Sequence, residues 1–184
     1  MGDDRERAEL HIAVIEYERE RTSIARQMFE SLAPRSPEVD AERLHYLVQC
    51  ARRLKLEESM LRYAKLAREA YPNSPWTMDA HRWAGNYYLL KNDTKAYVPL
   101  FRACADARPR DPESAYCHWK VAWAAYLGRE PAAAALLEDH LVRYPHSDKF
   151  AAALLFLGRL AERGGSLSSA QAYYRELLTV EPLS

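Results

Sequence analysis

The sequence predicts an all-α protein built as a solenoid of helical hairpins, and two observations lead to this prediction. The 184 residues include 29 Ala and 23 Leu but only 7 Val, 3 Ile and 4 Thr. Such an excess of helix formers over β-branched residues disfavours a sandwich, a barrel or a doubly wound sheet. In addition, prolines recur along the chain at a nearly constant spacing, which is typical of a repeat protein. We therefore expect a single domain, residues 1–184, made of repeated helical units.

The proline spacing defines these units. The intervals from Pro34 to Pro72, Pro109, Pro145 and Pro182 are 38, 37, 36 and 37 residues. Because proline cannot continue a helix, each of these residues should mark the end of a helical unit. The expected repeats cover about residues 8–37, 38–74, 75–111, 112–147 and 148–184.

Each unit is expected to contain two helices, as residues 150–182 illustrate. Apolar residues follow helical spacing from Phe150 to Ala161, and Gly164-Gly165 then interrupts the pattern. A second apolar stripe follows, and comparable breaks are expected near Lys55, Asn92-Asp93 and Gly128 in the earlier units. Close helix packing, with axes about 8–10 Å apart, explains small residues at the contact positions. These small residues are Gly85, Gly158, Ala133 and Ala170.

The residues of the last unit resemble the tetratricopeptide repeat (TPR). The resemblance rests on Leu157-Gly158, Ala161, Gly165, Ala170, Tyr174 and Pro182. It implies a right-handed superhelix of about five TPR-like helix-turn-helix hairpins, in which the first helix of each hairpin lines a concave surface.

A narrower resemblance extends over most of residues 38–182. The segments 71–76, 84–89, 118–123 and 143–147 are similar to the superhelical scaffold of soluble lytic murein transglycosylases, as in Tyr71-Pro72-Asn73-Ser74-Pro75-Trp76. This resemblance implies a periplasmic protein in which the helical region positions a peptidoglycan glycan strand or a partner protein. If it does not hold, a cytoplasmic location is the expectation.

The catalytic signature of that family is missing from the chain. Its catalytic glutamate lies in a Glu-Ser context that is followed by Gly-Leu-Met-Gln. The three Glu-Ser pairs of this sequence are Glu30-Ser31, Glu58-Ser59 and Glu113-Ser114, and no such stretch follows any of them. We therefore expect this chain to be non-catalytic. The alternative to a transglycosylase scaffold is a stand-alone TPR adaptor that binds an extended peptide in its concave groove.

The candidate binding residues lie at equivalent places in four successive first helices. Tyr46, Trp83, Trp119 and Phe156 are separated by 37, 36 and 37 residues, and nearby polar residues could donate hydrogen bonds. Aromatic faces beside amides and guanidinium groups suit an extended peptide or a sugar chain. The competing interpretation is that the aromatic residues only pack one repeat against the next. The polar candidates are Arg82, Asn86, His118 and Arg159, with His45 and Gln49 beside them.

Composition and spacing argue against several other functions. The 26 basic and 26 acidic residues balance, which disfavours binding to nucleic acid through phosphates. The histidines and cysteines lack the spacing of a metal site, so neither a metal nor another cofactor is expected. No apolar run approaches the roughly 20 residues that cross a membrane. Because solenoids normally cap their ends, an uncapped last repeat indicates either truncation of a longer array or a dimer contact.

Overall fold

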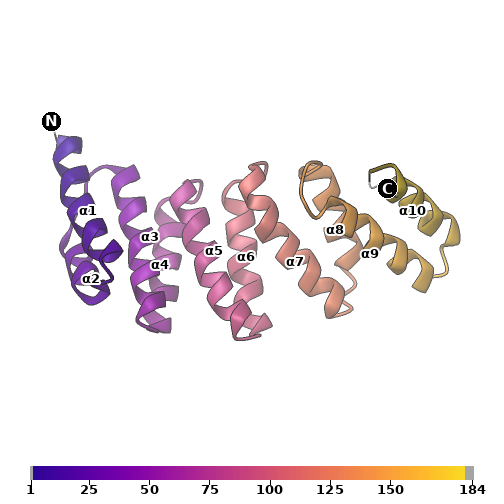
Figure 1. Ribbon diagram of the computed structural model, residues 1–184, viewed down its shortest axis with the longest axis horizontal. Helices are drawn as coiled ribbons and strands as arrows, with labels where there is room; N and C mark the ends of the chain where they lie inside the picture. The colour runs from indigo at the N-terminus through magenta and orange to yellow at the C-terminus, as the bar shows by residue number, and fades with distance from the viewer. Residues whose placement is uncertain (1, 181–184) are drawn as a thin grey trace. The chain divides into compact units, whose positions relative to one another are not determined.

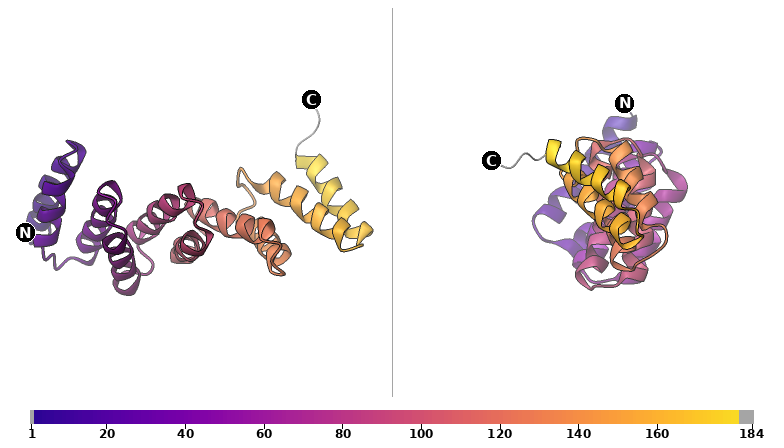
Figure 2. Two further views of the ribbon diagram at one scale, coloured as in Figure 1. Left: turned by 90° about the horizontal axis from the view of Figure 1, so that it is seen from below. Right: turned by 90° about the vertical axis from the view of Figure 1, so that its right-hand side faces the viewer.

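The computed structural model describes residues 2–180, and within that range it contains helices and no β-strand (Figures 1 and 2). Over residues 2–180, ten α-helices form five hairpins, so the prediction of an all-α, TPR-like architecture is confirmed. Pro182, which was expected to end the last helix, lies outside the described residues. The helices are α1 (Gly2–Glu18), α2 (Thr22–Ser31), α3 (Pro37–Arg53), α4 (Glu57–Ala70), α5 (Pro75–Leu90), α6 (Thr94–Ala107), α7 (Ala115–Leu127), α8 (Ala133–Arg143), α9 (Phe150–Arg163) and α10 (Leu167–Val180), with a 3-10 helix η1 (Pro112–Ser114) before α7.

The chain divides into two compact units, Met1–Arg108 and Pro109–Ser184. The first unit holds the hairpins α1–α2, α3–α4 and α5–α6, and the second holds α7–α8 and α9–α10. In the first unit, α3 packs on both α1 and α2, and α5 packs on both α3 and α4. In the second unit, α9 packs on α8. The expectation of one domain with the five repeat ranges given above stays a prediction.

Every hairpin turns at one residue in the left-handed backbone conformation. These residues lie 35, 37, 37 and 36 positions apart, so the turn repeats with nearly the period of the prolines. Glycine adopts this conformation without strain, whereas other residues pay about 1–2 kcal/mol for it. The five residues, of which the last alone is glycine, are Glu20, Lys55, Asn92, Arg129 and Gly165.

The same pair of hydrogen bonds closes each turn. In the α3–α4 hairpin, the N–H of Leu56 donates to the carbonyl of Ala51 at 2.8 Å, and the N–H of Lys55 donates to that of Arg52 at 3.2 Å. The other four hairpins have the equivalent two bonds. This is the Schellman arrangement, which satisfies carbonyl groups at the end of a helix. The sequence predicted a break at Gly128, but the left-handed residue is Arg129, and Gly128 has an ordinary φ of −72°.

Small residues allow the two helices of a hairpin to approach closely, as the sequence predicted. A Cβ atom placed on Gly85 of α5 would lie 2.9 Å from the ring of Phe101 on α6. A Cβ atom on Gly158 of α9 would overlap the ring of Tyr174 on α10. On the second helices, Ala133 is buried in α8 and Ala170 is buried in α10. An aromatic ring of the second helix thus occupies the space that the glycine side chain leaves empty.

Arginine residues join successive hairpins within each unit. The Arg53 guanidinium of α3 lies 3.6 Å from the ring centroid of Tyr17 on α1, and it donates to the Tyr17 carbonyl at 2.9 Å. In the second unit, the Arg163 guanidinium of α9 lies 5.5 Å from the ring centroid of Tyr126 on α7. Such cation–π contacts contribute about 0.5–2 kcal/mol each. The described helices include none that is both long and apolar enough to cross a membrane.

Two neighbouring glycines provide a test of the turn. Gly165 has φ = +77°, whereas Gly164 is right-handed (φ = −81°), and a Cβ there would make only ordinary contacts, the nearest at 3.5 Å. We expect Gly165→Ala to lower the free energy of unfolding by about 1 kcal/mol. The matched variant Gly164→Ala should be neutral or slightly stabilising. Urea denaturation of both variants measures the difference, and equal effects would contradict the assignment of the turn.

Candidate functional site

The predicted binding residues are divided between the two units. Tyr46 on α3 and Arg82, Trp83 and Asn86 on α5 belong to the first unit. His118 and Trp119 on α7 and Phe156 and Arg159 on α9 belong to the second. Each group is described within its own unit, and the single aromatic column proposed across all four repeats stays a prediction.

In the first unit, Tyr46 connects neighbouring hairpins. Its ring stacks on Phe29 of α2 with centroids 5.3 Å apart and planes at 10°, and it meets Tyr17 of α1 edge-on at 5.5 Å. Trp83 is half-buried, and the Arg52 guanidinium lies 4.8 Å from its ring centroid. Tyr46 therefore matches the packing interpretation, whereas the Trp83 ring is paired with a cation and remains partly accessible.

One polar candidate of the first unit, Arg82, is connected through Asp79 to a buried histidine. Arg82 forms an ion pair with Asp79 one turn earlier on α5, and Asn86 lies half-buried one turn later. His45 of α3 is buried, and its Nδ1 lies 3.8 Å from Asp79 Oδ2, beyond hydrogen-bond distance. Among the described atoms this Nδ1 has no hydrogen-bond partner. Burial lowers the pKa of His45 to about 4, although Asp79 acts in the opposite direction.

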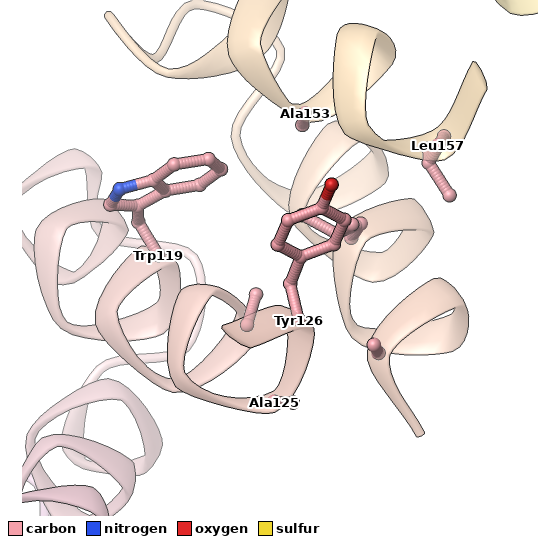
Figure 3. Close-up of a cluster of buried hydrophobic side chains, with 8 residues drawn as sticks. Trp119, Ala125, Tyr126, Ala153 and Leu157 are labelled. Atoms are coloured by element: carbon pink, nitrogen blue, oxygen red, sulfur yellow. The ribbon is translucent and has the colours of Figure 1, made fainter. Parts of the chain in front are cut away.

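In the second unit, four aromatic rings from α7 and α9 form a cluster. Trp119 and Trp123 stack with centroids 5.8 Å apart, and Trp123 and Tyr126 stack at 5.4 Å. Phe156 of α9 lies 4.7 Å from Trp123 and 4.6 Å from Tyr126. Trp119 and Tyr126 are each 7% exposed, whereas Trp123 and Phe156 are half-buried. Figure 3 shows Trp119 and Tyr126 on α7, opposite Ala153 and Leu157 of α9. We call Trp119, Trp123, Tyr126 and Phe156 the aromatic cluster.

Positive charge borders the aromatic cluster. The Arg159 guanidinium lies 5.5 Å from the Phe156 ring centroid, and Arg163 donates to the Tyr126 hydroxyl at 3.4 Å. A cavity of about 420 Å³ adjoins Tyr126 and Arg163. Aromatic faces and guanidinium groups together can bind apolar and acidic groups of a ligand. The remaining walls of the cavity are Arg129, Glu130 and Leu160.

Trp123, Tyr126 and Arg163 were not among the predicted binding residues. The prediction rested on one aromatic position per repeat, whereas Trp123 and Tyr126 follow Trp119 by four and seven residues and therefore share its face of α7. That helical spacing was the available signal. The structure also shows that Trp119 is part of the buried core of this unit.

A chain of four polar groups, of which the two histidines are buried, connects α7, α8 and the turn before α9. The Oγ of Ser147 lies 3.2 Å from Nε2 of His140, Nδ1 of His140 lies 3.2 Å from Nδ1 of His118, and Nε2 of His118 lies 3.0 Å from Oδ2 of Asp139. We call this chain the histidine relay. Arg143 donates to the other oxygen of Asp139 at 2.8 Å. His118 was predicted as a hydrogen-bond donor to a ligand, whereas its contact with His140 was not predicted from the sequence.

One assignment of protons satisfies every contact of the relay. With both rings neutral, His118 donates its Nε2–H to Asp139 and accepts at Nδ1. His140 then donates its Nδ1–H to His118 and accepts the Ser147 hydroxyl proton at Nε2. Burial, together with the neighbouring His118, lowers the pKa of His140 to about 4, which keeps that ring neutral at physiological pH. In the part of the chain that the structure describes, no three His, Cys, Asp or Glu side chains are arranged to hold a metal ion.

Comparisons with known proteins support the fold. No protein-family model matches the sequence, and no curated protein matches it. A crystal structure of MamA is similar over 100% of this chain and 98% of its own, with 15% identity and a TM-score of 0.59. A crystal structure of BtubC from P. vanneervenii is similar over 91% of this chain and 76% of its own, with 10% identity and a TM-score of 0.56. The chain therefore has the TPR-like fold of MamA, and at these identities the likeness concerns the fold alone.

The relay predicts a dependence of stability on pH. Because the pKa of His140 is about 4 in the folded chain and near 6.5 when unfolded, the unfolded state binds protons more readily. The stabilisation is complete above pH 6.5 and decreases as the pH falls toward 4, by up to about 3 kcal/mol for this residue. His45, whose pKa is lowered in the same direction, should add to the decrease.

Chemical denaturation at several pH values measures this effect. We expect His140→Asn to be less stable than the wild type at pH 7 but to lose less stability between pH 6.5 and 4. The exposed residue His146 supplies the control, because His146→Asn should retain the wild-type pH dependence. An unchanged pH dependence in His140→Asn would show that the relay does not contribute.

Proposed function

We propose that this chain is a stand-alone adaptor that binds an extended peptide segment of a partner protein and performs no chemistry itself. TPR-like scaffolds are typically non-catalytic and bind through the surfaces that their stacked hairpins create. The single observation that carries the proposal is the combination, in the second unit, of the aromatic cluster and its guanidinium border. Trp123 and Phe156 keep part of their rings accessible beside the exposed Arg159.

The chemistry of this surface indicates the composition of the peptide. Aromatic residues and arginine are enriched among the residues that dominate binding energy at protein interfaces. Trp123 and Phe156 would receive apolar side chains, and Arg159 would pair with a carboxylate. Glu162 is already engaged, because it accepts a hydrogen bond from the Tyr174 hydroxyl at 2.8 Å. We therefore infer a peptide that alternates apolar and acidic residues.

The narrower function predicted by resemblance is the scaffold of a periplasmic lytic transglycosylase that positions a glycan strand. The aromatic faces would suit sugar rings as well. However, the similar structures named above are MamA and BtubC, and neither points to a transglycosylase. The adaptor is accordingly our main proposal, and the glycan strand is an alternative that binding experiments can address. The periplasmic location stays a prediction.

Selection of random 12-residue peptides displayed on phage, with the whole chain as bait, tests the adaptor proposal. We expect the selected peptides to combine apolar and acidic residues. Arg159→Glu should weaken their binding at least about tenfold, equivalent to about 1.4 kcal/mol, without lowering the melting temperature, because Arg159 is exposed. Arg102→Glu, which reverses an exposed charge on α6, is the matched control and should bind normally.

Two results would contradict the adaptor proposal. The first is equal binding of the selected peptides to wild type, Arg159→Glu and Phe156→Ala. The second is binding of purified glycan strands, but of no peptide, in a manner that Arg159→Glu abolishes. The second result would favour the transglycosylase scaffold instead.

We also propose that the end of the second unit mediates self-association. Leu167 and Leu178 of α10 are 71% and 58% exposed and border a cavity of about 690 Å³. Stacked hairpins normally cover such a face with a following repeat or a polar cap. We expect dimerisation that depends on concentration in analytical ultracentrifugation and that Leu178→Lys abolishes. Leu90→Lys, at an exposed leucine of α5, should leave it unchanged; a wild type that stays monomeric at about 0.5 mM would contradict this proposal.

A further inference from the structure

A further pocket of the second unit lies between the segment that precedes α7 and the turn that precedes α9. Its volume is about 230 Å³, close to the size of one amino-acid residue and smaller than typical drug-sized sites. Much of its wall is apolar. This apolar wall consists of Pro112, Ala115, Tyr144 and Pro145.

The polar wall of the pocket contains two arginines, a serine and the neighbouring His146. Arg110 comes from the segment before η1, Arg143 from the last turn of α8, and Ser147 from the turn before α9. Arg110 and Arg143 also line a neighbouring, more open cavity of about 810 Å³. Their guanidinium groups are therefore accessible to a ligand that enters from solvent.

Hydrogen bonds hold both sides of the pocket in place. The Tyr144 hydroxyl donates to the Pro109 carbonyl at 2.9 Å, which anchors the segment that carries Arg110. On the opposite side, the histidine relay holds the Ser147 hydroxyl, and the N–H of Lys149 donates to Ser147 Oγ at 3.1 Å. A site with its walls fixed in advance binds a ligand at a smaller entropic cost.

The charges at the pocket favour a ligand with a single negative charge. Arg143 already shares its charge with Asp139, as described above. Arg110 makes no ion pair and no side-chain hydrogen bond with the residues that the structure describes. The pocket thus offers about one uncompensated positive charge, which matches a carboxylate better than a doubly charged phosphate.

Ser147 adds a second requirement for the ligand. Because its hydroxyl proton is directed to His140, the oxygen acts toward other groups as an acceptor only. Lys149 uses one of its two lone pairs, and the other remains for an N–H of a ligand. A nucleophilic role for Ser147 is disfavoured, because a histidine with a pKa of about 4 is a weak general base at neutral pH.

We propose that this pocket binds an apolar α-amido carboxylate, the group shared by N-acyl amino acids and by the C-terminal residue of a peptide. The carboxylate pairs with Arg110 and Arg143, the adjacent N–H donates to Ser147 Oγ, and the apolar side chain contacts Tyr144 and Pro145. The site shares no residue with the aromatic cluster or its guanidinium border. It therefore adds a second recognition element to the adaptor and does not depend on the peptide surface proposed above.

Titration of the ¹⁵N-labelled full chain with N-acetyl-leucine, followed by NMR, tests the proposal. We expect saturable shifts of amide signals in residues 110–115 and 143–149. N-acetyl-leucinamide, which lacks the charge, should bind at least about tenfold more weakly, and 4-methylpentanoate, which lacks the N–H, about threefold to tenfold more weakly. Equal affinity for the acid and its amide, or shifts only outside these residues, would overturn the proposal.

Two variants separate the roles of charge and hydrogen bond. Arg110→Gln should weaken binding of N-acetyl-leucine at least about tenfold, whereas Arg102→Gln, at an exposed arginine of α6 outside the pocket, should have no effect. Ser147→Ala should remove the preference for N-acetyl-leucine over 4-methylpentanoate, a result that loss of folding would not produce. Unchanged affinity in Arg110→Gln would overturn the proposal.

The two sources of the ligand are distinguished by acetyl-Gly-Gly-Leu with a free or an amidated C-terminus. Tighter binding of the free-acid peptide than of N-acetyl-leucine supports a peptide C-terminus. Binding of N-acetyl-leucine alone supports a small N-acyl amino acid. Binding of neither compound overturns the proposal without affecting the proposed peptide surface on α7 and α9.

Discussion

A helical hairpin of this chain cannot bury its own apolar stripe, and the rest of the structure follows from that constraint. Within a unit, a first helix packs against the hairpin before it, as α3 does on α1 and α2 and α5 does on α3 and α4. The contacts between hairpins then place aromatic and basic side chains together, such as Tyr17 with Arg53. The proposed binding surfaces result from this stacking, because the aromatic rings that join hairpins remain partly exposed at their edges.

The second unit is held together both by apolar packing and by a chain of polar contacts. Its aromatic cluster is apolar and packs α7 against α9, whereas its histidine relay is polar and connects α7, α8 and the turn before α9. A buried polar group stabilises a fold only when its partners are in place. The relay meets that condition in one proton arrangement, and so it fixes the orientation of both imidazole rings and of the Ser147 hydroxyl. The pocket beside it thereby acquires an acceptor whose direction is set by buried groups.

Much of the fold was predictable because its signals are local. Proline spacing and apolar periodicity report on neighbouring residues, and they located the five hairpins. The turn at Arg129 was harder to place, because hydrogen bonds of the backbone hold that residue in a conformation that its side chain does not favour. The relay could not be predicted, since His118 and His140 lie 22 residues apart and meet only after α7 and α8 pack. The aromatic residues were recognisable from their period, but their burial depends on contacts between helices.

The regular placement of the left-handed turns has a consequence for how such a chain can change in length. Successive turns lie 35 to 37 residues apart and use the same backbone hydrogen bonds with different side chains. A whole hairpin inserted by duplication would therefore bring its own turn and present the same face to its neighbours. An insertion of a few residues inside a helix would instead rotate the apolar stripe away from the adjacent hairpin. Gain or loss of complete repeats is accordingly the change in length that this architecture tolerates best.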